Sequence, residues 1–291
     1  MTAAIWLLAL ASSTVVVPGG SIAVTVEASP PALSRADLLG WVEGSARAVA
    51  AYYGTFPVPA VQLAIHPGGP GKVGGGRTWN TPEGARIEIS VGDATSKADL
   101  MADWELTHEM VHLAFPSQGR RQAWIEEGLA TYVEPIARAR AGRGKTDEIW
   151  RWLVWGLPQG EKAVAGSGLD MARGHDATYW GGALFCFLAD VEIRKRTDNR
   201  KSLDDALRGI VRAGGNVTVS WDLARTFAEG DKATGVPVLT ELYERMGKEP
   251  MASDATAVLA SLGVSGDRSA VTLDDKAPLS AIRHGIETGQ R

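Results

Sequence analysis

The chain has 291 residues, a net charge of −4 and one cysteine. This length is enough for one large core or two lobes without disulfides, and Cys186 alone can form neither a disulfide within the chain nor a four-thiolate zinc site. The 30 Lys and Arg against 34 Asp and Glu give no basic excess that would attract a phosphate backbone, so we expect no nucleic-acid partner.

The N-terminal segment is apolar and carries no charged side chain before Glu27. The run Ile5–Ala11 is typical of the hydrophobic part of a signal peptide, and Ala9-Leu10-Ala11 provides a cleavage site. We therefore expect residues 1–20 to be a signal peptide or an N-terminal membrane anchor, and the protein to be exported to the periplasm, the exterior or a membrane surface. A cytoplasmic protein is the alternative, because the segment lacks the usual Lys or Arg and Ser12 ends the apolar run early.

The first half of the chain carries strand and helix patterns in turn. Alternating apolar residues predict a strand at 22–26, and an apolar period of 3.6 predicts a helix over 34–53 with a serine cap. Further strands are expected at 61–65 and 87–91, separated by a glycine-dense loop at 67–76.

From residue 96 onward the pattern is mostly helical. Because strands come first and helices later, the order favours an α+β fold over repeated βαβ units. We expect a folded domain over 21–247, followed by a tail over 248–291 with little core of its own. The helices are predicted at 97–115, 121–139, 146–155, 177–195, 203–213, 221–228 and 236–246.

The predicted helix at 97–115 contains the sequence His108-Glu109-Met110-Val111-His112. Residues four apart share one face of a helix, so the two imidazoles can bind one Zn²⁺ at about 2.0 to 2.1 Å. Glu109 lies about 100° around the helix from His108, where it can reach a water molecule at the metal without binding the metal itself. An apolar stripe beside the histidines, which includes Trp104, is expected to be buried.

A catalytic zinc site needs a third protein ligand and an open position for water. The segment Trp124–Ala130, WIEEGLA, follows a short polar turn and predicts a helix that packs back against the first one. Glu127 shares a face of this helix with Trp124 and Thr131, whereas Glu126 points elsewhere. The geometry therefore favours Glu127 over Glu126 as the third ligand, with a surface glutamate as the alternative.

These two segments resemble the gluzincin zinc peptidases and are most similar to the aminopeptidase N and leukotriene-hydrolase branch, whose second motif reads W-L-x-E-G-x-A. The resemblance implies that His108, His112 and Glu127 bind one Zn²⁺ and that Glu109 is the general base. The segment Tyr179–Ala183 is similar to the Y-E-K-G-A segment of that branch, which implies that Tyr179 stabilises the oxyanion. An exposed or core tyrosine is the alternative.

The resemblance also implies a fold, namely an N-terminal mixed sheet with an edge strand near the cleft, zinc-site helices and a mainly helical C-terminal lobe. The chain departs from that branch in three ways. His112 and Glu127 are closer in sequence, Trp180 replaces the glutamate after the tyrosine, and the G-x-M-E-N stretch that holds a free amine is absent. An aminopeptidase is therefore not supported. The side chains expected to orient the histidines are Asp103, Glu105 and Thr131, with a solvated surface carboxylate as the alternative for Glu105.

The sequence therefore predicts a zinc-dependent hydrolase that acts on peptide or protein substrates. Glu109 would take a proton from a water molecule that zinc activates and pass it to the leaving amine, while Tyr179 would hold the oxyanion. Two alternatives stay open: a zinc-stabilised protein- or peptide-binding domain without catalysis, and a helical domain without metal. Glu109 argues against the first, because a purely structural site needs no base.

Overall fold

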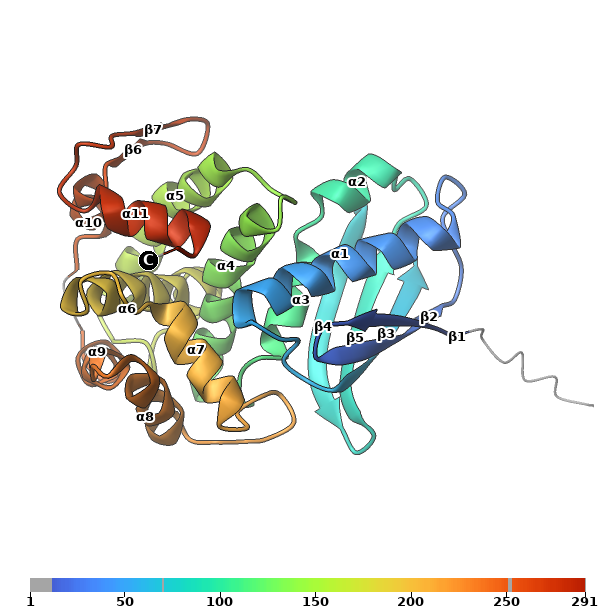
Figure 1. Ribbon diagram of the computed structural model, residues 1–291, viewed down its shortest axis with the longest axis horizontal. Helices are drawn as coiled ribbons and strands as arrows, with labels where there is room; N and C mark the ends of the chain where they lie inside the picture. Colours follow the sequence, from blue (N-terminus) through green and yellow to red (C-terminus); the bar gives the residue numbers. More distant parts are fainter. Residues whose placement is uncertain (1–11, 70, 251–252, 291) are drawn as a thin grey trace, which may run out of the picture.

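The computed structural model describes residues 12–69, 71–250 and 253–290, and places a sheet-containing part beside a helical part (Figure 1). The expected order of strands first and helices later is confirmed. The apolar run Ile5–Ala11 lies outside the described residues. Among the residues that are described, no helix is both long and apolar enough to cross a membrane.

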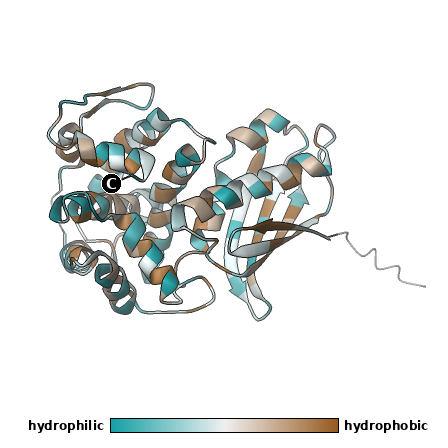
Figure 2. Cartoon of the chain, in the orientation of Figure 1, coloured by the Kyte–Doolittle hydropathy of each residue, from teal (hydrophilic) through white to brown (hydrophobic). Residues whose placement is uncertain are grey.

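The N-terminal part is a mixed sheet, in which the described strands follow the order β1-β2-β3-β5-β4. β1 (Ser12–Val17) and β2 (Gly20–Val26) pair antiparallel, β3 (Ala60–Pro67) and β5 (Gly84–Val91) extend the sheet in parallel, and β4 (Val73–Thr81) is an antiparallel edge strand. Hydrophobic residues follow these strands beneath the helix that covers them (Figure 2).

Helix α1 (Arg35–Tyr53) joins the parallel strands β2 and β3 and lies across one face of the sheet (Figure 1). Parallel neighbours need such a crossover, so the fold contains one βαβ unit within its α+β order. As predicted, Ser34 caps the helix, and it does so through a capping box with Asp37.

The sheet begins earlier than the expected domain boundary at residue 21. β1 pairs with β2 along its whole length, and Val15 and Val17 are buried in the core. The boundary therefore falls inside a hairpin, because in sequence the apolar residues of β1 look like the end of a leader.

The glycine-dense segment expected to be a loop at 67–76 is partly a strand. β4 starts at Val73, and its register against β5 shifts between Gly74 and Arg77. Gly75 has a φ of 69°, which lies in the left-handed region that favours glycine. The glycines thus form a bulge in an edge strand, a feature that bends the strand locally.

The helix predicted at 97–115 is two helices, α2 (Lys97–Ala102) and α3 (Glu105–His112). Asp103 separates them, because its carboxylate accepts hydrogen bonds from the backbone of Glu105 and Leu106 at the start of α3. The resulting turn carries Trp104 to the surface, where it is 46% exposed. The prediction that Trp104 belongs to a buried stripe was therefore wrong.

The helical part contains the remaining predicted helices with some changes of length. α5 continues to Val164, beyond the predicted end at residue 155, and the helix expected from residue 177 begins with a π-helical turn, η2 (Asp176–Gly181). After the short turn η1 (Arg120–Gln122), the helices are α4 (Ala123–Arg140), α5 (Thr146–Val164), α6 (Gly182–Arg196), α7 (Leu203–Arg212), α8 (Leu223–Thr234) and α9 (Val238–Met246).

The segment 248–291 was expected to be a tail with little core of its own, and its described residues fold onto the helical part. It forms α10 (Ala255–Ser261), the hairpin β6 (Val264–Gly266) and β7 (Val271–Leu273), and α11 (Ser280–Thr288). The Arg140 and Arg194 guanidinium groups, from α4 and α6, donate to backbone carbonyls of α11. Its few apolar residues therefore share the core of the helical part rather than building one of their own.

Candidate metal centre and active-site cleft

The three predicted ligands lie together where α3 faces α4. Nε2 of His108 is 3.3 Å and Nε2 of His112 is 3.6 Å from Oε2 of Glu127. Donor atoms about 2.0 to 2.1 Å from a tetrahedral ion lie about 3.3 to 3.4 Å apart, so both distances to Glu127 are close to those of a zinc site. All three donor atoms lie within 4.8 Å of one another, a group that could hold a metal ion. Two imidazoles and a carboxylate also form a donor set that zinc commonly binds.

Close packing between helices brings Glu127 to this position. A Cβ on Gly128 would lie only 2.6 Å from the backbone nitrogen of Ala183 and would overlap Gly182. α4 and α6 therefore cross at a pair of glycines. Trp124 fixes the start of α4, because its Nε1 donates to the buried carboxylate of Asp170 at 2.9 Å.

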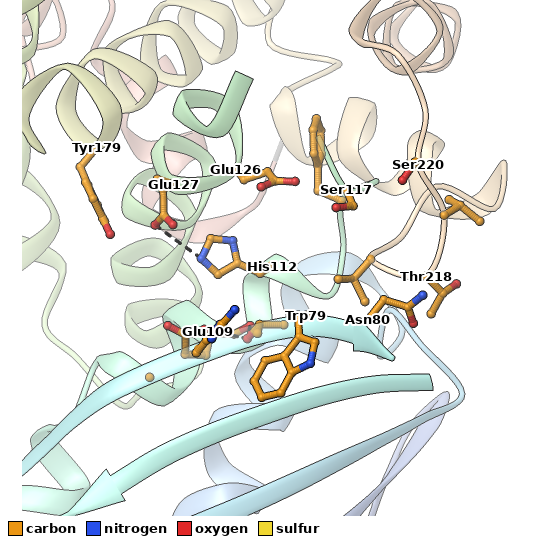
Figure 3. Close-up of a pocket in the computed structure, with 16 residues that line it drawn as sticks. Trp79, Asn80, Glu109, His112, Ser117, Glu126, Glu127, Tyr179, Thr218 and Ser220 are labelled. Carbon is orange, nitrogen blue, oxygen red and sulfur yellow. Dashed lines mark hydrogen bonds and ion pairs between the residues drawn. The ribbon is translucent and has the colours of Figure 1, made fainter. Parts of the chain in front are cut away.

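The neighbouring Glu126 lines the cleft but is engaged elsewhere. Its Oε1 accepts a hydrogen bond from the backbone N–H of Gln118 at 2.6 Å. Burial raises the pKa of Glu126, against the lowering effect of that hydrogen bond. The structure thus brings Glu127, and not Glu126, to the two histidines, and Figure 3 shows Glu127 directed at His112 while Glu126 lies farther along the cleft.

The charges of the centre are strongly coupled. Burial lowers the pKa of His112, but the hydrogen bond and negative charge of Glu127 outweigh this effect and raise the pKa to about 9. Burial would raise the pKa of Glu127, yet hydrogen bonds from His108 and His112 hold it well below its usual range. The carboxylate of Glu127 is therefore ionised at neutral pH.

Glu109 is 7% exposed, lines the cleft and is held by the edge strand β4. The Thr78 hydroxyl lies 2.7 Å from Oε2 of Glu109 and 2.9 Å from its backbone carbonyl oxygen, either of which accepts its proton. A Cβ on Gly76 would lie 2.7 Å from Cγ of Glu109. β4 thus approaches α3 closely because a glycine faces Glu109, a contact that the sequence pattern did not reveal.

Tyr179 lies in the π-helical turn η2, a distortion often found at functional sites, and lines the same cleft. Its ring stacks on His175 at 4.5 Å and faces His108 at 6.3 Å between centroids. Burial, together with the charge and hydrogen bond of Glu127, raises the pKa of Tyr179 to about 12. Its hydroxyl therefore stays protonated at neutral pH and can donate a hydrogen bond.

The cleft has a volume of about 480 Å³. β4 forms one wall, which includes Trp79 and Asn80, and the segment Val217–Ser220 forms another (Figure 3). This segment is held in place because the backbone N–H of Ser117 donates to Val219 and that of Val217 donates to Leu113. No pattern in the sequence marks residues 217–220, since they are small, neutral and far from the motifs.

Of the three side chains expected to orient the histidines, Asp103 and Glu105 have other partners. Asp103 accepts from the backbone at the start of α3 and from Nε1 of Trp41 at 3.0 Å. Glu105 accepts from the backbone N–H of Gly76 at 2.6 Å, so it connects α3 to β4. Thr131 is buried and lines a smaller cavity next to His108.

No protein-family model matches this chain, and comparison with curated proteins gives no match. Solved structures share its fold. An aminopeptidase N family protein from Idiomarina loihiensis has a TM-score of 0.62 and 12% identity, over 87% of this chain and 49% of that chain. An M1 zinc metallopeptidase from Deinococcus radiodurans has a TM-score of 0.52 and 14% identity, over 84% and 52%.

A mutant M1 zinc metallopeptidase from Deinococcus radiodurans, bound to a Tyr-Ser-Ala substrate, has a TM-score of 0.51 and 12% identity, over 84% of this chain and 52% of that chain. The present chain thus spans about half the length of the solved structures that it matches. At these identities the likeness shows the fold.

Proposed function

We propose that this protein is a zinc-dependent hydrolase of peptide bonds. The proposal rests on the convergence of His108, His112 and Glu127 into a group that could hold a metal ion, beside a cleft that Glu109 and Tyr179 also line. The shared fold with zinc metallopeptidases supports it.

In this proposal His108, His112 and Glu127 hold one Zn²⁺, which supplies Lewis-acid chemistry that polarises a carbonyl group and makes a water molecule more acidic. Glu109 acts as the general base and takes a proton from the attacking water. The hydroxyl of Thr78 keeps its carboxylate directed into the cleft. After attack, Glu109 passes the proton to the leaving amine, which completes the cleavage.

Tyr179 is proposed to stabilise the negative charge that develops on the carbonyl oxygen. A neutral hydroxyl can donate to an oxyanion, and the raised pKa of Tyr179 keeps its proton in place. Removing one such donor typically lowers kcat by about 10²- to 10³-fold, so Tyr179→Phe should fall in this range.

The edge strand β4 is proposed to bind the substrate backbone. An extended peptide can add to a free sheet edge through backbone hydrogen bonds, and β4 is such an edge beside the metal centre. Its cleft-lining stretch Gly76–Asn80 contains no acidic residue that would pair with a free amino group, and Glu126, which also lines the cleft, accepts a hydrogen bond from the backbone of Gln118. We therefore propose that the cleft accepts an internal peptide segment rather than requiring the amino terminus.

Elemental analysis and a peptide-library digest test the proposal together. The wild-type protein should bind one zinc ion and cleave peptides, Glu109→Gln should retain zinc and lose cleavage, and Glu127→Ala should lose zinc. A zinc-loaded wild type that cleaves nothing would favour the binding domain without catalysis. A protein purified without zinc, and unable to bind it when zinc is added, would contradict the metal site altogether.

We also propose that the protein is exported, on the basis of its apolar N-terminal residues. Fractionation of cells that express the full chain, with mass analysis of its amino terminus, tests this. Recovery of the intact chain in the cytoplasm alone would contradict export.

A further inference from the structure

A second cavity, of about 180 Å³, lies directly beside the metal centre. Tyr179 lines both this cavity and the cleft, and His108 forms part of its wall. Tyr179 therefore lies between the two spaces, next to the proposed reaction site. We call the cavity the tryptophan pocket, and its main walls are Trp104, Trp152, Trp155, Trp180, Thr131 and Tyr179.

The inner walls of the tryptophan pocket are preformed and held by packing. The ring centroids of Trp152 and Trp155 lie 4.7 Å and 5.3 Å from that of Trp180, within the range of favourable aromatic pairs. A Cβ on Gly156 would overlap the ring of Trp180, so α5 leaves just enough room for that ring. Trp180 is 1% exposed, which leaves its position little freedom.

Trp104 forms the outer wall of the pocket. It comes from the turn between α2 and α3, contacts His108 edge-to-face at 5.6 Å and is 46% exposed. A large apolar side chain so exposed, and adjoining a cavity, gains free energy when another apolar group covers it. On its open side the pocket therefore presents the apolar face of Trp104, which an apolar group of a ligand would cover.

The size of the tryptophan pocket suits a single side chain. Its 180 Å³ is well below the roughly 300 Å³ at which pockets for whole ligands begin. The larger cleft next to it is lined mainly by polar groups, so the two spaces differ in the chemistry that they can bind.

The charges around the tryptophan pocket disfavour a cationic side chain. Glu134 reaches the wall, but Arg138 pairs with its carboxylate. Beyond Glu134, an adjoining cavity of about 310 Å³ is lined by Arg151 and Arg268, and also by Glu148, which pairs with Arg151. The Glu134 carboxylate is thus already paired, and the adjoining cavity has three arginines against two glutamates, a small positive excess.

We propose that the tryptophan pocket binds an aromatic or large aliphatic side chain of the substrate at one of the residues that flank the cleaved bond. This selectivity rests on the proposed peptidase function, because that function assigns the neighbouring cleft to the peptide backbone. It identifies Trp104, Trp152, Trp155 and Trp180 as residues that determine specificity.

The test compares peptides that differ only at one position beside the cut, with Phe, Ala or Lys there. Cut sites mapped in a peptide library first show which position matters. Zinc-loaded wild type should then have a kcat/KM for the Phe peptide at least about tenfold above that for the Ala peptide, a typical value for filling an apolar pocket. The Lys peptide should gain nothing over Ala.

Trp104→Ala and Trp155→Ala should each reduce the Phe-to-Ala ratio to about threefold or less. Trp104 is half exposed, so its replacement does not open the core, and melting curves verify the folding of both variants. Trp221→Ala is the matched control, because Trp221 packs under Arg225 outside the pocket and should leave the ratio unchanged. A wild type that cleaves peptides without such a preference, or variants that keep it, would overturn the inference and leave the peptidase proposal standing.

Binding to the zinc-loaded Glu109→Gln variant separates the two proposals. Calorimetric titration should show at least about tenfold tighter binding of the Phe peptide than of the Ala peptide, and adding Trp104→Ala should remove the difference. Even if the wild type cleaves nothing, tighter binding of the Phe peptide that depends on Trp104 would still support the proposed side-chain preference of the tryptophan pocket. Equal affinities, or no binding of either peptide, would overturn it.

Discussion

Replacing Gly128 with alanine is expected to force α4 away from α6 and to disrupt the metal centre. The new Cβ would lie 2.6 Å from the backbone nitrogen of Ala183 and closer still to Gly182. Ordinary contact between such atoms needs about 3.5 Å, so the helices must move apart by roughly 1 Å or more. Overpacking usually costs about 1 to 3 kcal/mol. Because the obstacle is backbone that cannot rotate away, we expect the upper end, about 3 kcal/mol.

This cost should appear as a fall in Tm of about 6 to 12 °C, at about 2 to 4 °C per kcal/mol for a chain of this size. Glu127 precedes the altered residue, so zinc should also bind more weakly. Thermal denaturation followed by circular dichroism, and zinc titration of the metal-free protein, measure the two effects.

Gly40→Ala provides the matched control for Gly128→Ala. Gly40 also lies inside a helix, but a Cβ there would meet nothing within 4 Å. Alanine is the better helix former, so this variant should be more stable by about 0.5 to 1 kcal/mol. If Gly128→Ala melted like the wild type and bound zinc as tightly, the argument from close packing would be refuted.

Three further results are expected. Thr78→Val should lower kcat/KM about tenfold or more without loss of zinc, because hydrogen bonds to charged groups contribute about 1.5 to 3 kcal/mol, whereas Thr78→Ser should retain most activity. Ser96→Ala should lower the urea-unfolding free energy by about 1 kcal/mol through loss of the α2 cap, and no loss would contradict the capping role. Hydrogen bonds from Lys72 and Ser96 lower the pKa of Asp99 from 3.8 to about 2. Its stabilising effect is therefore present above pH 3.8 and disappears as the pH falls through about 2. The urea midpoints of wild type and Asp99→Asn should converge over that interval, and a constant difference would contradict this linkage.

The sequence predicted the parts of the structure that depend on local rules. The spacing of His108 and His112 places both on one face of α3 whatever surrounds the helix. The capping boxes of Ser34 and Ser96 likewise involve residues three apart, and both helices begin where the pattern indicated. Glu127 could be favoured over Glu126 because successive residues of one helix point in different directions, and only Glu127 shares a face with Trp124 and Thr131.

The predictions that failed concern residues whose partners are distant in sequence. Asp103 is an exception in part, because its carboxylate begins α3 through the backbone of Glu105 and Leu106, a local signal that the continuous apolar period obscured. Its hydrogen bond from Trp41 on α1 is the distant contact. β4 contains the glycines of an expected loop, because β5 provides a strand for them to pair with and Gly75 absorbs the mismatch in register. Local rules cannot include such partners.

Glycines within helices are a further signal in the sequence. Each costs about 0.5 to 1 kcal/mol relative to alanine, so a helix glycine is favoured where another group needs the space of the absent side chain, as at Gly128 and Gly156 but not at Gly40. Gly128 admits the backbone of α6, and Gly156 admits the ring of Trp180. The first contact places Glu127 at the histidines, and the second forms a wall of the tryptophan pocket. The many glycines and tryptophans of this chain are therefore partly complementary, because helix glycines make room for the residues that shape the site.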